Sequence, residues 1–423
     1  MLLPSLDEPK NARIRPEDKG LPQRAVGLTV GEFLATGPKL SEFWTPLVVL
    51  DDSRLRHNVS VLADWCAGHG FELMPHGKTT MAPLLWRRQL EAGATGITLA
   101  TMGQVRAARG FGFDSIMLAN ELVFPDALRY IAGELADPDF EFHCWADSVA
   151  GVEAMDRALA AAATHRPLNV CVDLGWADNG RTGVRTVAEA VAIADRIERS
   201  SHLRLAGIAA YEGTLAHDRS AEGVSRVRSY LESVVEFHDA LAGRFGDAEM
   251  LVTIGGSAFF DVVAEILAPA MAAARNTRWV LRSGAYITHD EGFYQSVSPL
   301  DAAVAGPADA LRPAARGLAR VISHPEPGLS LLDGGKRDFP YDEDLPVPLA
   351  RAGSGPATLA HRTTQLADQH AFVRGAEDDQ LEVGTLVWLG LSHPCTTFDK
   401  WRIIPVVAEF GSEDVVELVQ TYF

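Results

Sequence analysis

Strand-like and helix-like segments alternate along this chain between residues 72 and 282, and the alternation limits the folds open to it. Eight short apolar runs are separated by longer segments in which apolar residues recur every three or four positions. The strand-like runs cover 72–75, 96–100, 115–119, 140–145, 168–173, 203–210, 249–254 and 278–282. Alternating strands and helices form right-handed crossovers and a parallel sheet, and eight strands within about 210 residues predict an α/β fold, a closed (β/α)8 barrel of the TIM type. An open doubly wound sheet is the alternative, but it requires a Gly-rich phosphate turn that does not follow residues 72–75.

The pattern changes at about residue 284, where the long helical segments end. Residues 285–423 contain short alternating runs separated by Pro and Gly turns, which predict a smaller β-rich domain after the barrel. Its strand-like runs are 317–323, 328–332, 370–373, 385–391, 401–407 and 415–421. We assign 43–284 to the barrel domain, although the strand-like run at 43–50 is left over from the barrel count and could join the β-rich domain. Residues 1–42 are polar and interrupted by prolines, and we expect an arm or a loosely attached cover there.

The chain carries 56 acidic and 38 basic side chains, and this net charge of -18 argues against a nucleic-acid partner and against docking to an anionic membrane. The N-terminus lacks the apolar core of a signal peptide, and no other segment reaches the roughly 18 apolar residues of a membrane span. The four cysteines lie far apart and form no CxxC motif, which is typical of a reduced compartment. We therefore expect a soluble, cytoplasmic protein.

The segment Pro75-His76-Gly77-Lys78 follows the first strand of the predicted barrel, and reactive groups of such barrels gather at the C-terminal ends of the strands. A lysine that is shielded from water there loses its proton more easily, because desolvation disfavours the charged form, and Schiff-base chemistry requires such an amine. Taken alone, the motif is more typical of an ordinary surface lysine. The case for chemistry depends on the motifs that accompany it.

Thr253-Ile254-Gly255-Gly256-Ser257 follows the seventh strand, where barrels often hold a phosphate against a helix N-terminus. Two glycines let backbone N–H groups approach an anion, and Ser257 either donates to the phosphate or caps the next helix. Gly284 and Tyr286, in the neighbouring loop, would complete such a site. A tight turn followed by an N-cap is the alternative interpretation.

Arg181 follows the fifth strand and could bind a cofactor oxygen or a substrate carboxylate; a surface ion pair is the alternative. Tyr211 follows the sixth strand and offers a phenol there, unless it is a packed side chain whose hydroxyl is satisfied. Other polar residues of the same predicted rim are Asn120, Glu121, Asp147, Asp173, Asn179 and Glu212.

His393 and Cys395 are separated by one residue near the C-terminus. In an extended segment this spacing puts both side chains on one face, where imidazole and thiolate could share an ion such as Zn²⁺. Two ligands are too few for a closed structural site, so an open site completed by water would be catalytic in character. A chance pair is the alternative, and Asp399 and His370 are further candidate ligands.

These motifs occur in the order found in one family. The segments that carry the resemblance are 45–51, 75–79, 181–183, 211–213, 255–257, 284–286 and 393–395. The chain resembles the D-serine dehydratase and D-threonine aldolase group, which is similar to the alanine racemase-like pyridoxal-phosphate enzymes of fold type III. The resemblance extends from about residue 40 to the C-terminus, with Gly77 standing where the family commonly has a larger residue.

The resemblance implies that Lys78 holds pyridoxal 5'-phosphate through a Schiff base and that Arg181 lies near the ring hydroxyl. It places Gly255, Gly256, Ser257 and Tyr286 near the phosphate, and we count His76, Tyr211 and Gly284 among the cofactor-binding residues. It also implies that His393 and Cys395 bind a divalent metal beside the substrate's β-hydroxyl, with zinc preferred over manganese, cobalt or magnesium.

The resemblance further implies a lyase for D-3-hydroxy amino acids. Cys395 favours a dehydratase that gives a 2-oxo acid and ammonia, because the aldolase branch usually shows His-x-Asp at that place. Retro-aldol cleavage to glycine and an aldehyde is the alternative, and a racemase is a third. A pyridoxal-phosphate-binding homeostasis protein is the alternative outside the enzymes. The family implies a homodimer.

Overall fold

We describe the chain from a computed structural model that covers residues 7–162, 164–177, 180–353, 359–379 and 381–423. The described residues divide into two compact units, and each is described by itself. The first unit contains Ala63–Lys78 and Gln89–Gly284. The second contains residues 7–62, Thr79–Arg88 and Ala285–Phe423. The first boundary therefore differs from our assignment of 43–284 to one domain, because the strand at the start of that range belongs to the second unit.

The first unit is built on an eight-stranded parallel sheet with the order β2-β9-β8-β7-β6-β5-β4-β3. Its strands are β2 (Glu72–Leu73), β3 (Ile97–Leu99), β4 (Ser115–Glu121), β5 (Glu141–Ala146), β6 (Leu168–Leu174), β7 (Leu203–Ala210), β8 (Met250–Ile254) and β9 (Thr277–Leu281). A parallel bridge between His76 and Thr98 joins the end of β2 to β3 and closes the sheet. This confirms the predicted barrel and excludes the open doubly wound alternative.

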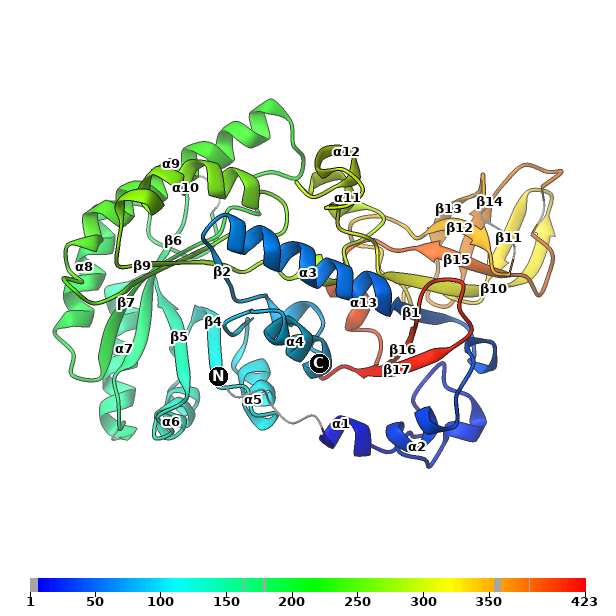
Figure 1. Cartoon of the computed structure of the whole chain (residues 1–423), viewed down its shortest axis with the longest axis horizontal. Helices are drawn as coiled ribbons and strands as arrows, with labels where there is room; N and C mark the ends of the chain where they lie inside the picture. Colours follow the sequence, from blue (N-terminus) through cyan, green and yellow to red (C-terminus); the bar gives the residue numbers. More distant parts are fainter. Residues whose placement is uncertain (1–6, 163, 178–179, 354–358, 380) are drawn as a thin grey trace. The chain divides into compact units, whose positions relative to one another are not determined.

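Helices alternate with the barrel strands, as the periodicity predicts. They are α3 (Asp52–Gly68), α4 (Pro83–Glu91), α5 (Met102–Gly110), α6 (Pro125–Glu134), α7 (Val149–Ala162), α8 (Val187–Glu198), α9 (Ala221–Ala242) and α10 (Phe260–Ala273). Helices α6 to α10 lie on the outside of the sheet (Figure 1). Local signals set their starts: Thr186 and Glu189 form a capping box at α8, and Pro125 occupies the first turn of α6.

The barrel interior consists of an apolar layer between two polar ones. Its apolar cluster includes Met74, Met117, Trp145, Cys171, Leu251 and Val280. Because strand side chains alternate between faces, residues two positions along from this cluster also face inward. They include Glu72 and Arg278 toward the N-terminal ends of the strands, and His76 and Arg282 toward the C-terminal ends. The C-terminal polar layer forms the floor of the candidate site.

The second unit contains a mainly antiparallel sheet, which confirms the predicted β-rich domain. Seven of its nine strands run in the order β13-β14-β11-β10-β1-β16-β17, and β15 pairs with β10 and β12. The strands are β1 (Leu47–Asp51), β10 (Ala315–Glu326), β11 (Leu329–Leu332), β12 (Val347–Arg351), β13 (Arg362–Leu366), β14 (Ala371–Arg374), β15 (Leu386–Gly390), β16 (Ile403–Val407) and β17 (Val415–Gln420). The left-over strand β1 joins this sheet between β10 and β16. Strands β12 and β13 were not predicted.

Residues 7–46 pack within the second unit instead of forming a loose arm. They include the helices α1 (Asp7–Asn11) and α2 (Val30–Ala35). Ile14 and Phe33 are buried, and Lys39 forms an antiparallel bridge with Asp414 near β17. Short helices that were not predicted occur at α11 (Phe293–Val297), α12 (Ala302–Ala305) and α13 (Cys395–Phe398). Within the described residues, no helix is long and apolar enough to cross a membrane.

Candidate active site

Lys78 lies in a short 3-10 turn, Gly77–Thr79, directly after β2. The backbone N–H of His76 donates to the Arg282 carbonyl oxygen over 3.2 Å and anchors this turn to β9. The Lys78 side chain is exposed, so burial does not shield its amine as we expected. Burial, together with the charges of Lys78 and Arg282, lowers the pKa of His76 well below its usual range. His76 Nδ1 is buried and has no hydrogen-bond partner among the described residues.

The turn after β8 has the features of an anion-binding site. Gly255 has a φ of +100°, and a Cβ atom there would lie 2.3 Å from Leu281 Cδ2, so the position requires glycine. Helix α10 begins behind Phe259, which makes no side-chain cap hydrogen bond. Within the described part of the chain, Ser257 makes no hydrogen bond. Uncapped N–H groups behind a glycine turn suit a phosphate.

Glu212 already holds the second glycine of this turn. The Gly256 N–H donates to Glu212 Oε1 over 2.7 Å, and the Glu212 side chain is fully buried. Burial raises the pKa of Glu212, although the Gly256 N–H opposes the shift. Its second oxygen, Oε2, has no partner among the described residues. A phosphate bound here would therefore rely on Ser257 and the first turn of α10.

Arg282, at the end of β9, is a buried cation that the sequence analysis missed. Its guanidinium donates to the Thr253 carbonyl oxygen over 3.1 Å, to Thr253 Oγ1 over 3.0 Å and to the Ala210 carbonyl oxygen. It also lies 5.6 Å from the Trp145 ring. The sequence does carry a signal for Arg282: it lies two residues after Val280, and this spacing directs its side chain into the barrel.

Three carboxyl groups gather at the ends of β4, β5 and β6. Burial raises the pKa of Glu121 to about 7, and the neighbouring charges of Asp173 and Asp147 add to the effect. Burial also raises the pKa of Asp173. The Asp147 carboxylate accepts a hydrogen bond from the Gly183 N–H over 3.4 Å. Because burial disfavours the charged form, Glu121 and Asp173 keep their protons to a higher pH than isolated carboxyl groups do.

The Arg181 guanidinium lies 5.6 Å from the ring centre of Tyr211, so the structure brings these two predicted residues together. The Tyr211 side chain is 37% exposed, whereas its backbone N–H donates to the Tyr230 hydroxyl oxygen over 3.2 Å. Asn179, another residue of the predicted rim, lies outside the described residues.

Gly284 and Tyr286 fall on either side of the boundary between the units. Gly284 follows Ser283, whose hydroxyl donates to the Gly256 carbonyl oxygen over 2.6 Å and so joins the loop after β9 to the glycine turn. Tyr286 is buried in the second unit, in the 3-10 turn Ala285–Ile287.

The His393-Pro394-Cys395 segment turns instead of extending. His393 has a φ of +50°, Pro394 has helical dihedral angles, and Cys395 begins α13. The expected extended spacing is therefore wrong, because the left-handed His393 residue leads directly into a helix. The two side chains still meet: burial lowers the pKa of His393, but hydrogen bonds with Cys395 and Asp342 outweigh it and raise the pKa to about 9.

Two carboxylates hold His393 in this unusual conformation. Asp342 Oδ2 is hydrogen-bonded to His393 Nδ1, and Asp342 Oδ1 accepts from the Thr396 hydroxyl over 2.6 Å. Asp290 is buried, and its Oδ2 accepts from the His393 backbone N–H over 3.0 Å. Its Oδ1 accepts from the Gly292 N–H, also over 3.0 Å. A left-handed conformation at a residue other than glycine costs about 1–3 kcal/mol, and these hydrogen bonds offset that cost.

No third protein ligand joins His393 and Cys395: the described residues contain no cluster of three His, Cys, Asp or Glu side chains suited to a metal. Asp399 is ion-paired with Lys400 over 3.2 Å, and His370 is exposed. Cys395 Sγ instead lies 3.5 Å from Thr79 Oγ1.

The residues fit both groups that the sequence analysis implied. The Gly255 turn, with its φ of +100°, leads through Ser257 to the uncapped start of α10, and these groups offer hydrogen-bond donors to a phosphate. The buried, unpartnered Nδ1 of His76 is a polar atom suited to a bound ligand. A thiol and an imidazole that meet at one point are ligands typical of zinc.

Two family models match parts of this chain. Residues 50–260 match the model of the alanine racemase N-terminal domain, and residues 314–407 match that of the serine dehydratase domain. A D-threonine aldolase from Arthrobacter sp. is 27% identical over 385 residues, which are 90% of this chain and 94% of that protein.

Two solved structures share the fold. D-threonine aldolase from Filomicrobium marinum superposes with a TM-score of 0.75 at 22% identity, over 91% of this chain and 97% of that one. A cysteine-to-alanine variant of D-threo-3-hydroxyaspartate dehydratase in its metal-free form gives a TM-score of 0.73 at 21% identity, over 91% and 99%.

Proposed function

Because the chain belongs to the alanine racemase-like, fold type III family of pyridoxal-phosphate enzymes, we propose that it is a metal-dependent dehydratase of D-3-hydroxy amino acids. D-Serine and D-threonine are the substrates we propose, and the products are a 2-oxo acid and ammonia. Relatives of this chain are named as enzymes of D-hydroxy amino acids, among them a D-threonine aldolase and a D-threo-3-hydroxyaspartate dehydratase.

We assign the cofactor roles to residues of the first unit. When bound, pyridoxal phosphate supplies an electron sink that makes the α-proton of an attached amino acid removable. Lys78 would hold it, and Ser257 with the first turn of α10 would bind its phosphate. Arg181 would bind the ring hydroxyl beside Tyr211. Once freed by the incoming substrate, the Lys78 amine is the base that accepts the α-proton.

We assign the departure of the β-hydroxyl to the metal pair. A divalent ion on His393 and Cys395, zinc by preference, would act as a Lewis acid toward that oxygen. The Asp342 carboxylate keeps the proton of the His393 ring on Nδ1, so Nε2 is the nitrogen left for the ion. Loss of the α-proton and of the hydroxyl as water gives an enamine, which hydrolyses to the 2-oxo acid and ammonia.

The observation that carries this proposal is the meeting of His393 and Cys395 within the segment that matches the serine dehydratase domain. The test is a product analysis with D-serine, D-threonine and D-threo-3-hydroxyaspartate. We expect oxo acid and ammonia in equal amounts, loss of turnover after EDTA treatment, and recovery with Zn²⁺. Turnover that survives complete metal removal would contradict the metal's role.

Retro-aldol cleavage is the second candidate, and one observation favours it: the Arthrobacter D-threonine aldolase aligns with this chain over 94% of its own length. In that reaction a base takes the hydroxyl proton and the Cα–Cβ bond breaks. Glycine and acetaldehyde from D-threonine would establish this reaction instead of the elimination.

We also propose a cytoplasmic homodimer, an expectation taken from the family. Size-exclusion chromatography with light scattering tests the assembly, and a mass of one chain would contradict it. A protein that binds the cofactor but turns over no D-3-hydroxy amino acid would be a pyridoxal-phosphate carrier instead.

A further inference from the structure

A cavity of about 540 Å³ opens at the N-terminal end of the barrel, away from the Lys78 end of the strands. Its lining combines charged residues at the starts of the strands with apolar ones behind them. Ala206, on β7, lines it at a position in the apolar layer where most other strands carry a larger side chain. The small Ala206 side chain leaves room for the cavity to reach His143 on β5.

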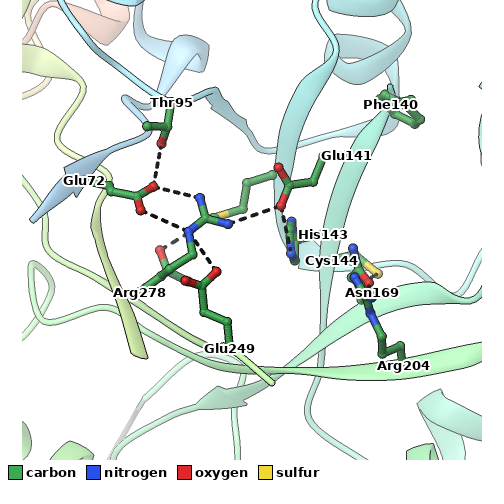
Figure 2. A network of polar contacts seen from close by, with 12 residues as sticks. Glu72, Thr95, Phe140, Glu141, His143, Cys144, Asn169, Arg204, Glu249 and Arg278 are labelled. Carbon is green, nitrogen blue, oxygen red and sulfur yellow. Dashed lines mark hydrogen bonds and ion pairs between the residues drawn. The ribbon is translucent and has the colours of Figure 1, made fainter. Parts of the chain in front are cut away.

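Most charges around this cavity are already paired. Figure 2 shows Arg278 between three carboxylates: Glu72 at 2.7 Å, Glu141 at 3.3 Å and Glu249 at 3.6 Å. Arg244 pairs with carboxylates of α8, at 2.7 and 2.8 Å. The charges of Arg278 and Arg244 are therefore already balanced by carboxylates.

Arg204 differs from these two arginines. Its Nε donates to Asn169 Oδ1 over 2.7 Å, but within the described chain its terminal nitrogens have no hydrogen bond or ion pair. A guanidinium carries two terminal NH₂ groups in a planar fork that matches a carboxylate. Arg204 therefore offers an uncommitted carboxylate-binding group at the edge of the cavity.

His143 offers the complementary group. It is 6% exposed, its Nε2 lies 3.8 Å from Glu141 Oε1, and its Nδ1 is buried with no hydrogen-bond partner among the described residues. Burial lowers the pKa of His143 to about 4, so the ring is neutral at pH 7. With its proton on Nε2, toward the Glu141 carboxylate, Nδ1 is an acceptor that lacks a donor. A buried acceptor without a donor costs about 1–3 kcal/mol.

We propose that this cavity binds a small zwitterionic amino acid, with its carboxylate on Arg204 and its ammonium group on His143 Nδ1 and Glu141. The ammonium supplies the donor that Nδ1 lacks, and its charge is balanced by the 43% exposed Glu141. A side chain would extend along Ala206 and Leu251. The site lies at the opposite ends of the strands from the proposed cofactor site, so both could be filled at once.

The test uses glycine as the probe, because glycine has no β-hydroxyl for the proposed reactions to remove. Binding is measured by a ligand-observed NMR titration of the protein loaded with pyridoxal phosphate. The cofactor absorbance is followed in parallel, because it responds to glycine at the Lys78 site alone. The variants are Arg204→Gln and, as a matched control on the exposed face of α7, Arg157→Gln.

Glycine that binds in the cavity leaves the cofactor absorbance unchanged. We expect Arg204→Gln to weaken this binding about tenfold or more, since the substitution removes a charge-assisted pair. Arg157→Gln should bind like the wild type. A crystal soaked in glycine should show density between Arg204 and His143. Soaked crystals without that density, or equal binding by the two variants, would overturn the proposal. A protein that takes up no cofactor would refute the proposed function but leave this titration interpretable.

Discussion

The Asp342 carboxylate is hydrogen-bonded to Nδ1 of His393 and keeps a proton on that nitrogen, because a carboxylate only accepts. A carboxylate in this position also holds the plane of the ring, because its other oxygen accepts from Thr396 in the following turn. Metal-binding histidines are commonly oriented in this way. Asp342 is therefore a positioning residue, and the consequence of its removal can be measured.

Asp342→Asn should weaken zinc binding about 10- to 100-fold, since an amide no longer favours the proton on Nδ1. The dissociation constant is measured by competition with a chromophoric chelator, which reads metal affinity without turnover. Asp368→Asn is the matched control, because Asp368 forms an exposed ion pair with Arg337 elsewhere in the second unit. Equal zinc affinity in the two variants would show that Asp342 has no such role.

Lys78→Ala should abolish the visible absorbance of the bound cofactor, because that position supplies the proposed covalent attachment. His393→Ala should keep the cofactor absorbance and lose oxo-acid formation, since it removes a metal ligand only. The pair of variants thus separates the cofactor from the metal. Absorbance that persists in Lys78→Ala would mean that another amine holds the cofactor.

The sequence predicted the barrel well because each of its strands is an apolar run bounded by a helical segment. The strands at the edge of the second sheet gave no such signal: β13 is Arg362-Thr-Thr-Gln-Leu366, and only its last residue is buried. Its place depends on pairing with β14, which is a long-range contact. The packing of residues 7–42 likewise depends on distant partners, as in the bridge between Lys39 and Asp414.

Only part of the candidate site was predicted, because the sequence shows where strands end but not which side chains meet after folding. Lys78, Arg181 and the glycine turn follow strands and could be found from strand ends. Glu212 was placed on the rim, but its bond to the Gly256 N–H depends on two strands that are adjacent only after folding. Asp342 lies in a loop without strand or helix periodicity, and nothing in its neighbourhood marks it as the partner of His393.

Gly255→Ala should destabilise the protein by about 2–4 kcal/mol, because alanine is strained at a φ of +100° and its Cβ would collide with Leu281. Gly133→Ala is the control: it lies in α6, and a Cβ there meets no atom within 4 Å. This second change should stabilise the protein by about 0.5–1 kcal/mol through helix propensity. The free energy of unfolding in urea measures both, and a loss of under about 1 kcal/mol in Gly255→Ala would mean that the turn relaxes easily.

Glu121→Gln should change how stability depends on pH. Burial raises the pKa of Glu121 from 4.5 to about 7, so between these values the folded protein keeps a proton that the unfolded chain has lost. The free energy of unfolding of the wild type should therefore fall, relative to the variant, as the pH rises from 5 to 8, by about 2 kcal/mol. Glu153→Gln, on α7, is the control and should follow the wild type at both pH values. A Glu121→Gln profile parallel to that of the wild type would mean that Asp173, and not Glu121, holds the shared proton, because the two carboxyl groups compete for it.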